Sequence, residues 1–266
     1  AMTSGNKLYF GQPNGQFALG PQSQSISLAG WSWGCSAFDM DNDTFPDVYI
    51  ANGHESKQSV RDFEPYFWLH AIYVASSHDD LVKAAYFNSI SSRTRGHGYS
   101  YGGYEKNKLF LNHHATEFID IAHLFGVALE EDCRNVVTDD LDGDGKPDIL
   151  VTTFEAWPEQ KQTLRIFRNL IPHCGNWITV CLSPNVRKCS PVGATITIKS
   201  GSLTLTKPVV TGDSHRTQHT SQIHFGLGKT DRLDWLLVRW PDGATNILLS
   251  PAVNQTHYIR HPSAAP

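Results

Sequence analysis

The sequence predicts a mainly β protein, and three observations support that prediction. Two short runs of β-favouring residues, Val48–Ala51 and Ile149–Thr152, each follow an aspartate-rich loop. The region around them is duplicated within the chain. Only Asp79–Ile90 has a helical pattern, with Ser77 or Asp79 as its expected N-cap.

The duplication has a fixed offset. The segment Asn6–Phe10 recurs 101 residues later as Asn107–Leu111. Thirty-three residues after each of these asparagines begins an aspartate-rich loop, Asp39–Asp47 (loop 1) or Asp140–Asp148 (loop 2). Two motifs that share one spacing indicate a structural repeat, and Leu164–Asn169 is a partial third copy.

The C-terminal third continues as strands. Trp177–Leu182, Ala194–Ile198 and Trp235–Trp240 are rich in β-branched, aliphatic and aromatic residues. Turn residues separate them at Lys199–Gly201 and Pro241–Gly243. We therefore expect one further β module after the repeats.

Composition limits the classes of function. With 22 basic and 26 acidic residues the chain has a formal charge of −4, and it lacks the basic cluster that nucleic-acid binding needs. No apolar run is long enough to span a bilayer. Residues 1–5 carry no leader pattern, and we expect a secreted protein, or one of the secretory-pathway lumen, whose leader has been removed. Among five cysteines, Cys181 and Cys189 are spaced to bridge a hairpin, while buried thiols remain the alternative.

The aspartate loops have the chemistry of a calcium site. Each places carboxylates at positions 1, 3, 5 and 9, and position 7 adds a backbone carbonyl. Hard oxygen ligands in this number suit Ca²⁺. The predicted ligands are Asp39, Asp41, Asp43, the Phe45 carbonyl and Asp47 in loop 1, and Asp140, Asp142, Asp144, the Lys146 carbonyl and Asp148 in loop 2.

Rival interpretations of the loops are weaker. An EF-hand needs glutamate at position 12, where this chain has Ile50 and Val151. Zinc prefers His or Cys, which both loops lack. Two acidic surface turns without a metal remain the plain alternative. Loop 1 departs further from the pattern than loop 2, because Thr44 stands where loop 2 has Gly145. Asn42–Thr44 also forms a glycosylation sequon.

These motifs resemble FG-GAP/VCBS repeats, the calcium-loop blades of integrin-α-type β-propellers. Gly30–Gly34 is similar to a Trp-Gly-rich strand of the cartilage-acidic-protein group. The C-terminal third resembles the ASPIC/UnbV module that follows those repeats, on Asn176–Val180, Pro191–Ala194, Gly212, Thr217–Gln218, His224–Gly228 and Val238–Gly243.

The resemblance implies a partial or composite β-propeller of calcium-loop blades followed by a β-sandwich-like ASPIC/UnbV module. The implied domains are residues 1–172 (repeat 1 about 6–53, repeat 2 about 107–169) and residues 173–266. The family usually has more repeats, and two would leave strand edges unpaired. Further repeats in a longer chain, capping by the C-terminal module, or a homodimer would each cover those edges.

Residues 54–106, between the repeats, form an insertion that holds ten aromatic residues and four histidines. Long insertions often carry function, and we expect this one to bind a protein or small-molecule partner on a calcium-stabilised scaffold. The alternative is that its aromatics only pack it onto the blades.

An enzyme remains the second hypothesis for the function. It would catalyse a cofactor-free cyclisation or cycloaddition, such as a hetero-Diels–Alder reaction in natural-product biosynthesis, with Trp68, His70, Tyr99 and Tyr101 as candidates. A hydrolase using Ser32, in the G-x-S-x-G of Gly30–Gly34, is a distant third because no helical pattern follows the motif.

Overall fold

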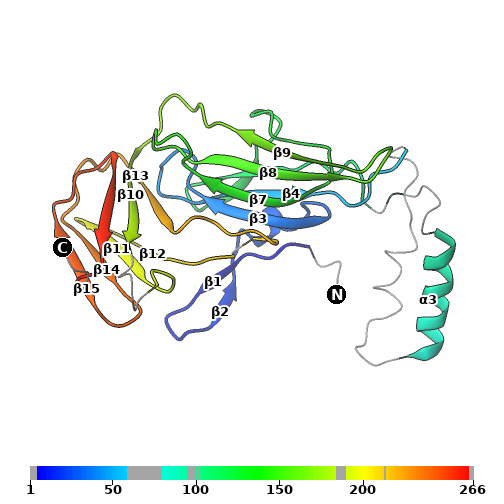
Figure 1. Cartoon of the computed structure of the whole chain (residues 1–266), viewed down its shortest axis with the longest axis horizontal. Helices are drawn as coiled ribbons and strands as arrows, with labels where there is room; N and C mark the ends of the chain where they lie inside the picture. Colours follow the sequence, from blue (N-terminus) through cyan, green and yellow to red (C-terminus); the bar gives the residue numbers. More distant parts are fainter. Residues whose placement is uncertain are drawn as a thin grey trace. The chain divides into compact units, whose positions relative to one another are not determined.

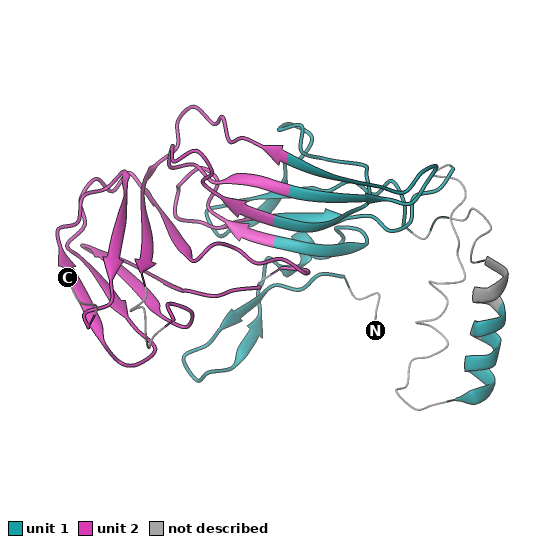
Figure 2. Ribbon diagram, viewed as in Figure 1, with its two compact units in different colours: residues 1–35, 48–136, 151–165 teal, residues 36–47, 137–150, 166–266 magenta. Residues whose placement is uncertain are grey.

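A computed structural model describes residues 5–58, 80–94, 100, 102–183, 190–212 and 214–263. The chain is mainly β, with five open sheets and two helices in these residues (Figure 1). It divides into two compact units, residues 1–35, 48–136 and 151–165, and residues 36–47, 137–150 and 166–266 (Figure 2). The second unit therefore contains both aspartate loops and the whole C-terminal module.

The first repeat forms a hairpin and two strands of a four-stranded sheet, whose other two strands come from the second repeat. The hairpin pairs β1 (Tyr9–Gly11) with β2 (Phe17–Leu19). The sheet runs in the order β3-β4-β5-β6. Its strands are β3 (Ser32–Phe38), β4 (Asp47–Asn52), β5 (Lys108–His113) and β6 (Glu117–Asp120). The pairing of β4 with β5 is antiparallel, with Val48 opposite Phe110, so the sheet joins residues that lie on either side of the insertion.

The second repeat supplies a three-stranded sheet in the order β7-β8-β9. Its strands are β7 (Cys133–Asp139), β8 (Asp148–Glu155) and β9 (Lys161–Phe167). Both ends of β7 lie 101 residues after the ends of β3, and β8 starts 101 residues after β4. The sequence duplication is thus a structural duplication of strand, aspartate loop and strand.

The described residues contain two helices, α1 and α3. Helix α1 (Ser23–Ser27) follows β2, and Ile26 packs with Ile50, Phe110 and Phe118 in a small core. Helix α3 (Leu81–Thr94) lies where the helical pattern predicts one. The predicted cap was wrong by at least one residue: the Asp80 carboxylate accepts hydrogen bonds from the backbone N–H groups of Val82 and Lys83 (both 3.1 Å).

The C-terminal module confirms the three predicted strand regions. One sheet has the order β13-β10-β16 and the other β12-β11-β14-β15. Apolar side chains of both sheets share one core that includes Ile178, Ile196, Phe225 and Leu236, which is the arrangement of a β-sandwich. The strands are β10 (Asn176–Ser183), β11 (Thr195–Ser200), β12 (Leu203–Pro208), β13 (Gln222–Gly228), β14 (Trp235–Arg239), β15 (Thr245–Leu249) and β16 (Gln255–Arg260).

Candidate metal centre

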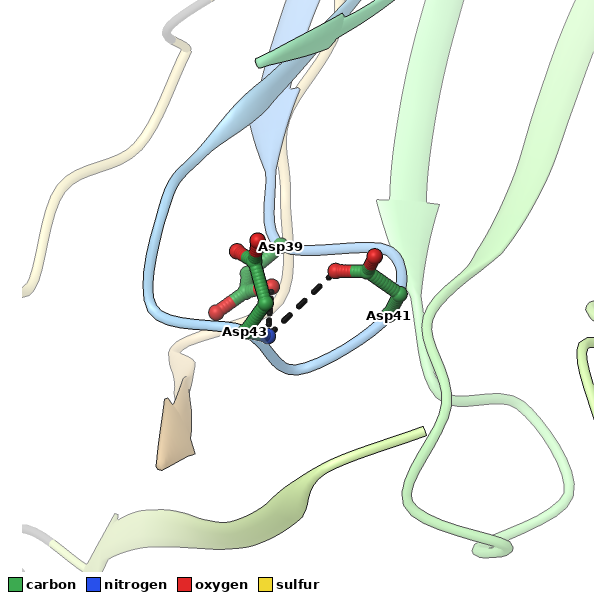
Figure 3. Close-up of side chains that lie close together, drawn as sticks. All are labelled: Asp39, Asp41 and Asp43. Carbon is green, nitrogen blue, oxygen red and sulfur yellow. Dashed lines mark hydrogen bonds between the residues drawn. The ribbon is translucent and has the colours of Figure 1, made fainter. Parts of the chain in front are cut away.

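Loops 1 and 2 each gather three carboxylates. One carboxylate oxygen from each of Asp39, Asp41 and Asp43 lies within 4.8 Å of the others, and the same holds for Asp140, Asp142 and Asp144. Figure 3 shows the three side chains of loop 1 pointing into the turn that its backbone encloses. Such a group of three can hold a metal ion.

The two loops repeat the same internal hydrogen bonds. The Asp43 N–H donates to Asp39 Oδ1 (2.9 Å) and Asp41 Oδ1 (3.3 Å), and the Asp144 N–H donates to Asp140 Oδ1 (3.1 Å) and Asp142 Oδ1 (3.3 Å). The Thr44 and Gly145 N–H groups each donate over 2.8 Å to the second oxygen of the first aspartate. These bonds fix the first carboxylate. Asp140 Oδ1 accepts a second bond, from the Gly143 N–H (2.9 Å), so a further lone pair is left on both oxygens of Asp39 and on Asp140 Oδ2.

Both loops also contain two residues with left-handed backbone conformation. The φ angles are 60° at Asn42 and 77° at the matched Gly143, then 85° at Thr44 and 84° at the matched Gly145. Asparagine and threonine in loop 1 thus adopt the left-handed conformation that glycine adopts in loop 2, where it costs little free energy. Thr44, the departure noted from the sequence, does not change the course of the loop.

The fourth aspartate of each loop lies outside the group of three. Asp47 Oδ2 accepts the Met40 N–H (3.0 Å), and Asp148 Oδ2 accepts the Leu141 N–H (3.2 Å). Asp148 Oδ1 also accepts the Asn169 N–H (2.7 Å). These two carboxylates close the bases of the loops. The amides of Phe45 and Lys146, whose carbonyls are predicted ligands, donate to Asp43 Oδ1 (2.8 Å) and Asp144 Oδ1 (3.0 Å).

Loop 1 is buried. Asp39 is 3% exposed, and burial together with the neighbouring Asp43 and Asp41 raises its pKa to about 7. A Cβ on Gly226 of β13 would lie 2.0 Å from Asp39 Oδ2, so the missing side chain there makes room for the carboxylate. The hydrogen bond from the Thr44 N–H and, to a smaller extent, the positive charge of the half-buried Lys207 lower the pKa of Asp39 and thereby partly offset these effects.

Loop 2 is more open. Asp142 and Asp144 are exposed, and Asp142 forms an ion pair with Arg168 (Nε to Oδ2, 2.6 Å). The Lys146 ammonium lies 3.2 Å from Asp144 Oδ2. Burial raises the pKa of Asp140, against hydrogen bonds from the Gly145 and Gly143 amides that lower it. The exposed Arg168 and the half-buried Lys146 therefore lie beside the carboxylates of loop 2, whereas the lysine whose charge acts on Asp39 of loop 1 is Lys207 of β12.

The ends of the insertion are held in place. His54 and Gly102 exchange two backbone hydrogen bonds (2.9 and 3.1 Å). The His54 ring packs against Trp31 and Trp33, and the Arg134 guanidinium lies 4.1 Å from the Trp33 ring centroid. These contacts anchor His54, the first residue of the insertion, through Trp31, Trp33 and Arg134, which lie outside it. The enzyme candidates Trp68, His70, Tyr99 and Tyr101 lie outside the described residues.

Two minor expectations from the sequence are corrected, and a third cannot be followed in the described residues. Cys181 carries a free thiol, and Cys189, its expected partner, lies outside the described residues. Asn42 is fully buried, with its amide hydrogen-bonded to Gly145 O, so the sequon is inaccessible in this fold. Ser32 begins strand β3, and its hydroxyl pairs with Asn6 and the Gly30 carbonyl. Ser32 therefore does not lie in the strand–turn–helix elbow that a nucleophile in this motif requires.

Sequence reasoning missed the residues that connect the loops to their surroundings. Asn169 Nδ2 donates to Met40 O (2.7 Å) and Pro147 O (3.1 Å), which joins the bases of both loops. Lys207 was missed because nothing in a strand pattern shows that its charge acts on Asp39. The placement of Asn169 in the partial third copy was the one available signal.

The C-terminal module contains an ASPIC/UnbV domain, because the family described as ASPIC and UnbV matches residues 187–266. The comparison with curated proteins gave no match. Among the described residues no helix has the length and apolar character needed to cross a membrane.

Proposed function

We propose that this chain, which carries an ASPIC/UnbV domain, is a calcium-stabilised β scaffold that presents its insertion to a protein or small-molecule partner. One observation carries the proposal: three carboxylates converge in each of two loops that share their internal geometry. Asp39, Asp41 and Asp43 would hold one ion, and Asp140, Asp142 and Asp144 the other.

The donor set fits Ca²⁺ better than the commoner alternatives. The side-chain donors of both loops are oxygens, which suits a hard cation, and zinc would take nitrogen or sulfur ligands. A bound ion would neutralise carboxylates that lie close together. It would also offset the burial and, to a smaller extent, the charges of Asp43 and Asp41 that raise the pKa of Asp39. It would thereby hold β3 to β4 and β7 to β8 at their connecting loops. The role is structural.

The finer fold assignment belongs to the same proposal. We propose that β3–β6 and β7–β9 are successive propeller blades of the FG-GAP/VCBS type, and that β1 and β2 are the outer half of another blade. Tyr9 and Phe17 are 55% and 75% exposed, whereas the residues 101 positions later, Phe110 and Phe118, are 5% and 9% exposed. β1 is the counterpart of β5. In the four-stranded sheet β4 pairs with one edge of β5, whereas in the described residues the matching edge of β1 pairs with no strand.

Helix α3 supports a binding role for the insertion. Leu81, Val82 and Tyr86 are 84%, 80% and 54% exposed, and Val82 and Tyr86 are four residues apart, on one face of the helix. Exposed apolar side chains at neighbouring positions are typical of surfaces that contact a partner. The insertion, with both ends anchored on the sheet, would present this helix.

Thermal unfolding tests the calcium proposal. Chelator-treated protein should melt at a higher temperature when Ca²⁺ is added, because the ion binds the folded chain alone. Replacing Asp41 and Asp43 together by asparagine should remove part of the rise, and Asp142 with Asp144 the rest. The matched control is Asp231→Asn, an exposed aspartate outside the loops. No rise with the unaltered chain would refute the proposal.

A further inference from the structure

Asn42 stands at the tip of loop 1 between two predicted ligands, and its side chain is fully buried. The matched residue of loop 2 is Gly143, where a Cβ would meet nothing within 4 Å. Loop 2 therefore reaches the same local conformation without any side chain at this position. The asparagine side chain of loop 1 is not needed for the turn, and its contacts outside the loop explain its presence.

Those contacts reach loop 2 in one direction. Asn42 Nδ2 donates to the carbonyl oxygen of Gly145 over 2.8 Å. This carbonyl belongs to the peptide group whose N–H, from Lys146, donates to Asp144 Oδ1 (3.0 Å). One peptide group of loop 2 is thus held on one side by loop 1 and on the other by a predicted ligand of loop 2.

In the other direction Asn42 reaches the ASPIC/UnbV domain. Its Oδ1 lies 2.7 Å from His224 Nε2, and its backbone carbonyl accepts the Gly228 N–H (2.6 Å). Because Nδ2 faces a carbonyl, Oδ1 must be the atom facing His224, which makes His224 Nε2 the donor. His224 Nδ1 then accepts the Thr179 hydroxyl (3.0 Å).

Packing connects the same residues by a second route, through Trp177. The Trp177 indole stacks on the His224 ring at 5.8 Å between centroids. A Cβ on Gly145 would lie 1.9 Å from Trp177 Nε1. Loop 2 therefore touches Trp177, Trp177 touches His224, His224 binds Asn42, and Asn42 binds loop 2. A displacement of any member must move the others, because packed side chains transmit small shifts.

We propose that Asn42 is a positioning residue that couples the two cation loops to each other through the ASPIC/UnbV domain. This inference rests on the proposed calcium function. An ion in loop 1 fixes the peptide groups on either side of Asn42, and Asn42 then fixes the Gly145–Lys146 peptide of loop 2. Binding at either loop consequently increases the affinity of the other, and the coupling is reciprocal. Asn169 joins the bases of the loops, so Asn42 is the link between their tips.

The test is a double-mutant cycle on the full chain, stripped with chelator and titrated with CaCl₂ in a calorimeter. Loop 2 affinity is measured with loop 1 intact and with loop 1 disabled by Asp41→Asn and Asp43→Asn. The same pair of measurements is then made in an Asn42→Gly background. Glycine suits the left-handed backbone at this position, as Gly143 shows in loop 2. The control background is Asn14→Gly, an exposed asparagine in the β1–β2 turn.

With Asn42 and in the Asn14→Gly control, disabling loop 1 should weaken loop 2 by about five-fold or more, at the lower end of typical coupling. In the Asn42→Gly background the change should be less than about two-fold. The amide NMR signals of the C-terminal sandwich should respond to loop 2 filling in the first case and much less in the second. Should Asn42→Gly fail to fold, Asn42→Asp keeps the size and backbone preference of asparagine while losing the donor to Gly145.

The outcomes separate the two claims. Equal coupling in the asparagine and glycine backgrounds, or independent loops in the unaltered chain, would overturn the role of Asn42 and leave the calcium scaffold standing. No binding in any background would overturn the scaffold itself and with it this inference.

Discussion

Loops 1 and 2 are close to identical in their backbone and differ in what surrounds them. In loop 1 Asp39 and Asn42 are buried, the positive charge of the half-buried Lys207 lowers the pKa of Asp39, and Gly226 of β13 leaves room for the Asp39 carboxylate. In loop 2 two of the three clustered carboxylates are exposed and pair with the exposed Arg168 and the partly buried Lys146.

This comparison separates the effects of the aspartate motif itself from the effects of the residues packed around it. Aspartate spacing and left-handed turns give both loops the same ligand arrangement, so both are expected to bind the same ion. Burial gives loop 1 alone a strong dependence on protons and on the packing of the ASPIC/UnbV domain. The two loops are therefore expected to differ in how their affinity responds to pH, mutation and salt.

The largest expected difference concerns packing. Gly226→Ala places a methyl group 2.0 Å from Asp39 Oδ2 and 2.6 Å from Asn42 Cα. Because loop 1 cannot move aside without breaking its bonds to β13, the variant should lose about 3 kcal/mol of unfolding free energy in urea. It should also lose calcium binding at loop 1 while loop 2 still binds. Gly11→Ala, whose added methyl has its nearest neighbour at 4.0 Å, is the control. A stable Gly226→Ala variant that fills both loops would contradict the buried setting of loop 1.

The next largest expected difference is in how the calcium affinity of each loop depends on pH. Because the pKa of Asp39 is raised to about 7, its proton competes with a cation below that pH. Affinity of loop 1 for Ca²⁺ should fall by up to about tenfold per pH unit as the pH drops from 7 to 5. Loop 2 also contains a raised carboxyl, Asp140, but a less buried one, and its affinity should fall less.

The measurement compares two variants that each keep one loop, Asp142→Asn with Asp144→Asn for loop 1, and Asp41→Asn with Asp43→Asn for loop 2. Titration calorimetry at pH 5, 6, 7 and 8 gives the two slopes. Equal slopes would show that burial does not distinguish the loops.

The smallest effect is expected at the exposed counter-ion of loop 2. Arg168 is 60% exposed at its side chain, so its ion pair with Asp142 contributes little stability. Arg168→Ala should change the unfolding free energy by less than about 0.5 kcal/mol and raise the calcium affinity of loop 2 two- to three-fold, because a competing cation has been removed. Arg232→Ala, at another exposed arginine, should change neither. A large loss of stability would indicate that loop 2 is less solvated than the structure shows.

Much of this arrangement could be predicted from the sequence. The predicted runs Val48–Ala51 and Ile149–Thr152 lie within β4 and β8, and the 101-residue offset between Asn6 and Asn107 recurs between β3 and β7, because duplicated patterns of β-favouring residues fold into the same strands. The alternation of aspartates predicts converging carboxylates because a bend brings every second side chain to one side. Pro191–Ala194 and His224–Gly228 lie within the segment that matches ASPIC and UnbV.

The setting of the loops could not be predicted in the same way. Asn42 and His224 are 182 residues apart in the chain, and no periodicity connects them. Whether the charge of Lys207 acts on Asp39 depends on the tertiary packing around β12, which no local sequence pattern encodes. The sequon at Asn42 illustrates the limit: a local pattern predicted exposure, and contacts with two distant segments made the side chain the most buried of its loop.

Ion counting tests the central claim most directly. Native mass spectrometry of the chelator-treated chain, before and after dialysis against Ca²⁺, reports how many ions each molecule retains. We predict two for the unaltered chain, one for each variant that keeps a single loop, and none when both loops are disabled. An unaltered chain that retains no calcium, or retains as much when both loops are disabled, would contradict the account.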